Sequence, residues 1–93
     1  MKGIRARLRI KGLVQGVYFR SYMQEVAERF NVNGWVKNCP DRTVEAVLEG
    51  SEENVKKVID WAQRGPPAAK ITDVDVEWED YIGEFKNFRI EYF

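Results

Sequence analysis

A strict alternation of apolar and basic residues near the N-terminus is the feature that most constrains the fold. Ile4, Ala6, Leu8 and Ile10 alternate with Arg5, Arg7, Arg9 and Lys11. Successive side chains of a strand point to opposite faces, so residues 4–11 are predicted to form a strand with one apolar and one basic face. Acidic residues alternate with apolar ones over residues 73–79. They predict a second strand, whose acidic face would pair with the basic face of the first.

Between these two strands the pattern changes twice to helical spacing. Residues 19–30 are predicted to form a helix whose buried side carries Tyr22, Val26, Ala27 and Phe30. Residues 35–38 and 43–49 are predicted to form a hairpin around Cys39-Pro40-Asp41-Arg42, because proline followed by aspartate favours a type I turn. A second helix is predicted to begin after the N-cap Ser51 and to end at Gly65-Pro66-Pro67. A last short strand is predicted over residues 88–92.

This order of elements defines the expected fold class. It is β-α-β-β-α-β plus a short extra strand, which predicts an α+β fold of the ferredoxin-like α/β sandwich type. Right-handed crossovers would place the two helices on one face of a mostly antiparallel sheet. A chain of 93 residues fits a single domain, residues 1–93. The fold is shared by binding modules, enzymes and regulatory domains, so it does not define the function.

Composition argues against several classes of function and setting. Lysine plus arginine (15) equals aspartate plus glutamate (15), whereas non-specific nucleic-acid binders usually carry a basic excess. No apolar run approaches the roughly 20 residues needed to span a bilayer, so we expect no membrane association. Cys39 is the only cysteine, which fits a reducing compartment, and we expect a cytoplasmic protein. Without histidine, Ser-His-Asp and Cys-His nucleophile systems and histidine metal sites are impossible.

The stretch from Lys11 to Arg20 is the strongest candidate for a binding site. It joins a predicted strand to a predicted helix, with Gly16 in the turn and Arg20 at the helix entrance. Backbone N–H groups at a helix start have no internal partner and favour an anion, and a guanidinium suits phosphate oxygens. Many strand-to-helix turns carry a glycine and an arginine without binding anything. From the residues alone, phosphate binding and a plain structural turn both remain open.

Longer motifs in the chain resemble the acylphosphatase family. Gly12-Leu13-Val14-Gln15-Gly16-Val17-Tyr18-Phe19-Arg20 is similar to the first signature of that family. Gly34-Trp35-Val36-Lys37-Asn38, followed by Val44 and Gly50, is similar to the second. Gly65-Pro66-Pro67-Ala68-Ala69 also resembles a family feature that follows the second helix. The resemblance runs nearly from end to end.

The resemblance implies an enzyme that hydrolyses the carboxyl–phosphate bond of acyl phosphates without metal or cofactor. It implies that Arg20 and the backbone amides of Gln15, Gly16, Val17, Tyr18 and Phe19 bind the phosphate. It also implies that Asn38 positions the attacking water. The substrate would be a small-molecule acyl phosphate and inorganic phosphate would be both product and inhibitor. The protein would be a monomer without a nucleic-acid partner. The side chain of Gln15 is alternatively a support for the loop.

Two residues depart from the family pattern. Arg42 and Tyr18 stand where the family commonly has glycine. If position 42 needs a positive φ, a side chain there costs on the order of 1 kcal/mol, and a shifted turn would move Asn38. A bulky Tyr18 would narrow access to the site.

The sequence leaves three alternative functions. One is a single-stranded RNA-binding module, which lacks support because the relevant stretch falls across a turn. Another is an acyl-phosphate- or carbamoyl-phosphate-handling domain of a larger enzyme. The chain begins with Met1 and ends after its last predicted strand, so a free-standing enzyme is expected. The third, a catalytically silent relative, is suggested by Arg42.

Overall fold

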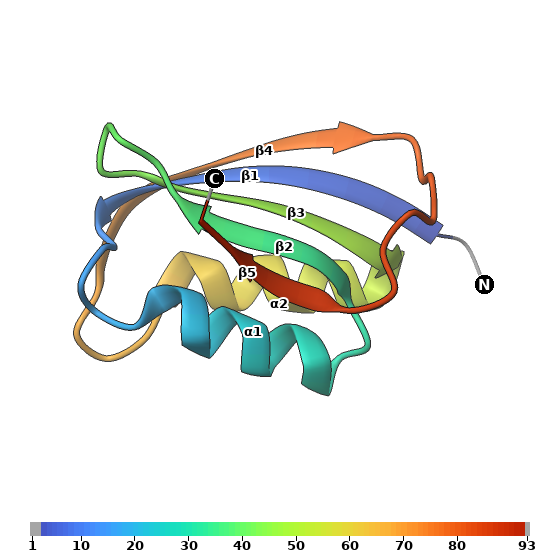
Figure 1. Cartoon of the computed structure of the whole chain (residues 1–93), viewed down its shortest axis with the longest axis horizontal. Coiled ribbons are helices and arrows are strands. Elements are labelled where there is room, and N and C mark those ends of the chain that lie inside the picture. The colour runs from blue at the N-terminus through green and yellow to red at the C-terminus, as the bar shows by residue number, and fades with distance from the viewer. Residues whose placement is uncertain (1–2, 93) are drawn as a thin grey trace.

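A computed structural model describes residues 3–92 of the chain. Within that range the elements run in the order β1 (Gly3–Leu13), α1 (Phe19–Arg29), β2 (Asn33–Asn38), β3 (Val44–Ser51), α2 (Glu52–Arg64), β4 (Lys70–Glu79) and β5 (Phe88–Glu91). The strands form one sheet in the order β4-β1-β3-β2-β5, and α1 and α2 lie on the same side of it (Figure 1). The predicted ferredoxin-like α+β fold is confirmed. None of the helices in this range is long and apolar enough to cross a membrane.

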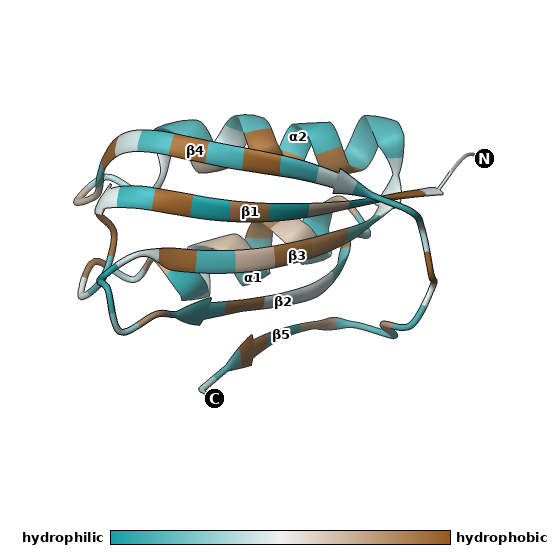
Figure 2. Ribbon diagram, turned by 90° about the horizontal axis from the view of Figure 1, so that it is seen from above, coloured by the Kyte–Doolittle hydropathy of each residue, from teal (hydrophilic) through white to brown (hydrophobic). Residues whose placement is uncertain are grey.

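The alternation in the sequence sets the two faces of the sheet. Along β1, apolar and polar residues alternate in Figure 2, and Ala6, Leu8 and Ile10 are completely buried beneath the helices. The opposite face carries the charges. Arg7 bonds to Glu45 of β3 at 3.0 Å and to Glu79 of β4 at 3.1 Å. The predicted pairing between the basic face of β1 and the acidic face of β4 is therefore confirmed.

The helices cover the apolar face of the sheet with stripes of buried residues. In α1 the buried residues are Phe19, Met23, Val26 and Ala27, at offsets of four, seven and eight from the first. The prediction that Tyr22 belongs to this stripe is wrong: its side chain is 41% exposed. Tyr22 comes one residue before the buried Met23, and one residue along an α-helix is a rotation of about 100°. The side chain of Tyr22 therefore points away from the buried stripe. Phe19 also packs against Trp61 of α2, with ring centroids 5.2 Å apart.

The start of α2 follows the sequence pattern closely. The hydroxyl oxygen of Ser51 accepts a hydrogen bond from the backbone N–H of Asn54 at 3.2 Å, so the predicted N-cap is confirmed. Glu52 and Glu53 follow in the first turn, where carboxylates interact favourably with the positive end of the helix dipole. The N-terminus of α2 is thus capped by the side chain of Ser51 and carries acidic residues in its first turn.

A tight crossing at Gly34 holds β2 against β3. Its φ is 143°, and a Cβ built on this residue would overlap the backbone carbonyl oxygen of Val47. Only glycine fits this approach. On the other side of β2, β5 pairs in parallel, with Val36 opposite Ile90. The remaining strand pairs are antiparallel, and the parallel β5 brings the end of the described chain next to Asn38.

Candidate active site

A pocket of about 290 Å³ opens where the turn after β1, the start of α1 and the ends of β2 and β5 meet. The turn and the helix start contribute Val14, Gly16, Tyr18, Phe19, Arg20 and Ser21 to its lining. Asn38 comes from β2, and Ile90 and Tyr92 come from the C-terminal segment. The structure therefore brings the two residues of greatest interest, Arg20 and Asn38, to one cavity.

The N-terminus of α1 differs from that of α2. Its N-cap residue is Tyr18, which makes no capping hydrogen bond through its side chain, and no acidic residue occupies the first turn. Arg20 lies in that first turn, where a cation is unfavourable unless an anion is also present. Within residues 3–92, Arg20 forms no ion pair, and its guanidinium carbon lies 5.2 Å from the centroid of the Tyr92 ring. The positive end of the helix dipole is therefore balanced by no acidic residue of its own first turn.

The loop before α1 has open space above its backbone at Gly16. Gly16 has a φ of 76°, a left-handed conformation that glycine adopts without strain. A Cβ built on Gly16 would meet no atom within 4 Å, so the space above its backbone is empty of protein. Tyr18 also has a positive φ, 64°. This backbone can approach a ligand closely at Gly16.

Asn38 is the last residue of β2, at the point where the chain turns into the hairpin. Its side-chain oxygen, Oδ1, is buried and has no hydrogen-bond partner among the described residues. A buried acceptor without a partner costs about 1–3 kcal/mol, so such a group in a native structure calls for an explanation. Asn38 also lines the pocket.

The hairpin after Asn38 is fixed by a dense set of hydrogen bonds. The N–H of Arg42 donates to the Cys39 carbonyl at 3.1 Å, which is the predicted turn between these residues. The Asp41 carboxylate accepts a hydrogen bond from the Thr43 hydroxyl at 2.6 Å, which holds the pKa of Asp41 below its usual range. Arg42 has a φ of 74°, so the positive φ considered for this position is present. The turn nevertheless keeps Asn38 in the pocket.

Two residues of the predicted phosphate loop do not line the pocket with their side chains. Val17 is 9% exposed and belongs to the core. The side chain of Gln15 donates hydrogen bonds to the carbonyl oxygens of Cys39 and Thr43, each 2.9 Å long. This geometry favours the alternative in which the Gln15 side chain supports the loop. The role of the loop amides as phosphate donors stays a prediction.

Sequence reasoning missed Ser21, Ile90 and Tyr92 as pocket residues. The alternation of Phe88, Ile90 and Tyr92 was a visible signal for a strand. It did not reveal that this strand would lie beside β2 and carry Ile90 and Tyr92 to the pocket. Among residues 3–92 no group of three or more potential metal-ligating side chains gathers at one place.

Comparison with known proteins identifies the family of the chain. The acylphosphatase family model matches residues 6–90. An acylphosphatase from Pyrobaculum islandicum is 58% identical over 91 residues, covering 97% of this chain and 96% of its own. The crystal structure of acylphosphatase from Bacillus subtilis superposes with a TM-score of 0.92 at 34% identity, covering 96% of this chain and 99% of that one.

A crystal structure of full-length HypF, in a phosphate- and nucleotide-bound form, has a TM-score of 0.88 at 27% identity. The match spans 97% of this chain but only 12% of the HypF chain.

The fold and these matches define a hydrolase that acts on acid anhydrides. The chain belongs to the acylphosphatase family and hydrolyses acyl phosphates. Membership of this family sets aside the alternative of an RNA-binding module.

Proposed function

We propose that Arg20 and the backbone amides of residues 15–19 hold the phosphate of the substrate while Asn38 positions the attacking water. The observation that carries this proposal is the shared pocket, in which a cation and an unpartnered carboxamide oxygen lie on different elements. Taken alone, either side chain could have a purely structural role. Together they provide the two functions that this hydrolysis needs, anion binding and water alignment.

Arg20 is suited to the phosphate by charge and position. Its guanidinium carries a permanent positive charge and a planar array of donors that matches phosphate oxygens. The uncapped start of α1 adds N–H groups and the positive end of a dipole. In the transition state of phosphoryl transfer, charge spreads over the equatorial oxygens, so these donors stabilise the transition state directly.

Asn38 is suited to the water because its carboxamide both accepts and donates hydrogen bonds and does not ionise. The unpartnered Oδ1 would accept a hydrogen bond from the water and orient it toward phosphorus. Holding the nucleophile in line removes part of the entropic barrier. Asn38 is too weak a base to take the proton, which therefore goes to a non-bridging oxygen of the phosphate.

The hydrolysis step needs only the substrate, one water molecule and the groups named above. The water oxygen bonds to phosphorus, and the bond between phosphorus and the acyl oxygen breaks. The electron pair leaves with the carboxylate, whose conjugate acid has a pKa of about 4, so no proton donor is needed. The products are a carboxylate and inorganic phosphate. We propose that phosphate, which fits the same donors, inhibits competitively, and that the protein works as a monomer without metal.

The test is hydrolysis of benzoyl phosphate with a chelator present, for the wild type, Arg20→Ala and a control, Arg29→Ala. Arg29 is an exposed arginine at the other end of α1. We expect chelator-insensitive hydrolysis, competitive inhibition by phosphate, and a loss of at least about a hundredfold in kcat/KM for Arg20→Ala only. Loss of activity with chelator would refute the metal-free site. Equal effects of the two arginine variants would refute the role of Arg20.

A further inference from the structure

The residues that line the pocket are of two chemical kinds. Gly16, Arg20 and Asn38 provide the groups that the proposed mechanism uses for phosphate and water. Tyr18, Ile90 and Tyr92 add side chains that this mechanism does not use. An acyl phosphate also has two parts, an anionic phosphate and an acyl group. A phosphate held by the first set leaves the acyl group to be placed by the remaining lining.

Tyr18 keeps a strained backbone although its ring does little for the fold. Its φ of 64° and ψ of 25° place it in the left-handed region, which costs a residue with a side chain on the order of 1 kcal/mol. The side chain is 76% exposed, and its hydroxyl has no hydrogen-bond partner within residues 3–92. Strain that persists at the edge of a pocket points to a function for the residue.

Tyr92, the residue directly after β5, lines the same pocket. Residues 88, 90 and 92 lie on one face of that segment, because side chains alternate along an extended chain. Along this face Phe88 is 3% exposed and in the core, Ile90 is half-buried, and Tyr92 is 82% exposed. The face therefore leads from the core to the mouth of the pocket. There the Tyr92 ring lies 5.2 Å from the guanidinium carbon of Arg20.

We propose that Tyr18, Ile90 and Tyr92 form an acyl subsite that selects acyl phosphates with aromatic or bulky apolar acyl groups. This inference rests on the proposed role of Arg20, because the phosphate position fixes where the acyl group begins. An aromatic acyl group placed there covers apolar surface of two exposed rings and of Ile90. Contacts between aromatic rings favour such a group by about 3- to 10-fold over one that lacks a ring. The acetyl group carries no ring, so it lacks these ring contacts.

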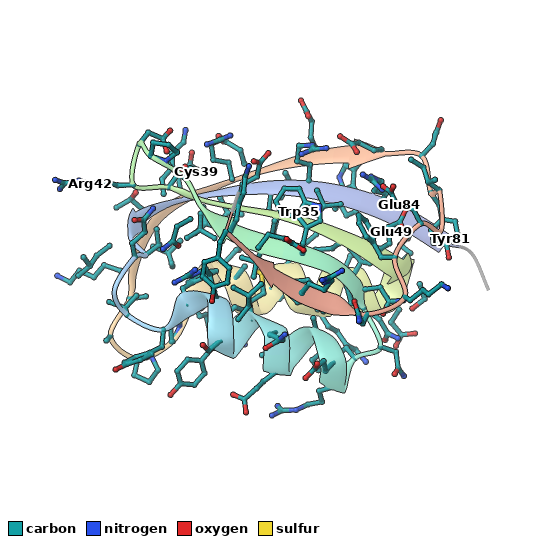
Figure 3. The ribbon with its side chains drawn as sticks, viewed as in Figure 1. Trp35, Cys39, Arg42, Glu49, Tyr81 and Glu84 are labelled. Carbon is teal, nitrogen blue, oxygen red and sulfur yellow. The ribbon has the colours of Figure 1, made fainter. Side chains whose placement is uncertain are left out.

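The experiment compares kcat/KM for benzoyl phosphate and acetyl phosphate in the wild type, Tyr18→Asn and Tyr92→Leu. Asparagine tolerates the left-handed conformation, so Tyr18→Asn removes the ring and keeps the loop. Tyr18→Gly is a second variant that removes the ring and the strain together. Tyr81→Ala is the control, because Tyr81 is 52% exposed and lies at the opposite end of the molecule from Cys39, the neighbour of Asn38 (Figure 3).

We expect each ring-deleting variant to lower the ratio of benzoyl to acetyl phosphate kcat/KM by about 3- to 10-fold. We expect Tyr81→Ala to keep the wild-type ratio. In the Tyr18 variants, inhibition by inorganic phosphate should stay within about twofold, because both substitutions keep the backbone N–H of residue 18 and remove only the ring. An unchanged ratio, or an equal loss for the two substrates, would overturn the subsite. Undiminished activity of Arg20→Ala would instead overturn the phosphate assignment, so the two failures are distinguishable.

Discussion

The side-chain amide of Gln15 donates a hydrogen bond to the carbonyl oxygen of Cys39 at 2.9 Å. The same nitrogen lies 2.9 Å from the carbonyl oxygen of Thr43. Gln15 belongs to the loop before α1, and Cys39 directly follows Asn38, so this contact joins the proposed phosphate donors to the proposed water holder. We propose that this contact fixes the relative position of the two halves of the site.

Gln15→Ala is therefore expected to reduce kcat by about tenfold, because Asn38 loses a fixed position relative to the loop. The inhibition constant of phosphate should change much less, since Arg20 is untouched. Steady-state kinetics on benzoyl phosphate measure the two effects. Gln63→Ala, an exposed glutamine on α2, is the matched control. A wild-type kcat in Gln15→Ala would show that this contact does not position Asn38.

Arg42→Gly is expected to stabilise the protein by about 0.5–1 kcal/mol. Arg42 has a φ of 74°, and its side chain points away from the molecule at the tip of the hairpin (Figure 3). Glycine relieves the left-handed strain, although it gains freedom in the unfolded chain. Denaturant unfolding gives the change in free energy, and Arg42→Ala, which keeps a Cβ, should give no such gain. A less stable Arg42→Gly variant would mean that the side chain has a stabilising contact.

Glu49→Gln is expected to destabilise the fold by about 2 kcal/mol. Glu49 is 2% exposed, and its Oε2 accepts hydrogen bonds from the N–H groups of Ile82 and Gly83 at 2.9 and 3.1 Å. It also pairs with Arg5 at 3.3 Å, and removing the charge weakens all three contacts. Glu77→Gln, on the exposed face of β4, serves as control. Equal unfolding midpoints for the two variants would contradict this role of Glu49.

The lowered pKa of Glu49 predicts that the protein loses stability in acid. Burial raises the pKa of Glu49, but the hydrogen bonds from Ile82, Gly83 and Arg5 outweigh it and hold the pKa below the ordinary value of 4.5. A carboxyl whose pKa is lower in the folded state stabilises that state above its unfolded pKa. This contribution disappears as the pH falls through the folded pKa. Unfolding free energies measured from pH 6 to pH 3 should fall, and fall less steeply in Glu49→Gln. Parallel pH profiles would exclude Glu49 as a source of the acid sensitivity.

Much of the fold was predictable because its signals are local. The period of two over residues 4–11, the N-cap Ser51 and the proline-aspartate turn each act within a few residues, and the structure confirms all three. Tyr22 was misplaced because a helical stripe can be shifted by one residue while still appearing periodic. Met23, the residue actually buried, is the adjacent position.

The parts that sequence reasoning missed depend on long-range pairing. The position of β5 beside β2, and hence of Ile90 and Tyr92 in the pocket, follows from a parallel pairing between distant segments. The contact from Gln15 to Cys39 likewise spans two loops. The motif resemblance pointed to Arg20 and Asn38 without knowledge of this pairing. It matches residues by their place in a sequence motif and does not need the three-dimensional geometry.

The central claim, that Asn38 positions the attacking water while other groups bind phosphate, is tested most directly by Asn38→Ala. Its kcat for benzoyl phosphate and its inhibition constant for phosphate are measured together, with the exposed Asn87→Ala as control. The account predicts a fall in kcat of about 10²- to 10³-fold with an inhibition constant within about threefold of the wild type. A kcat close to that of the wild type in a folded Asn38→Ala protein would contradict it.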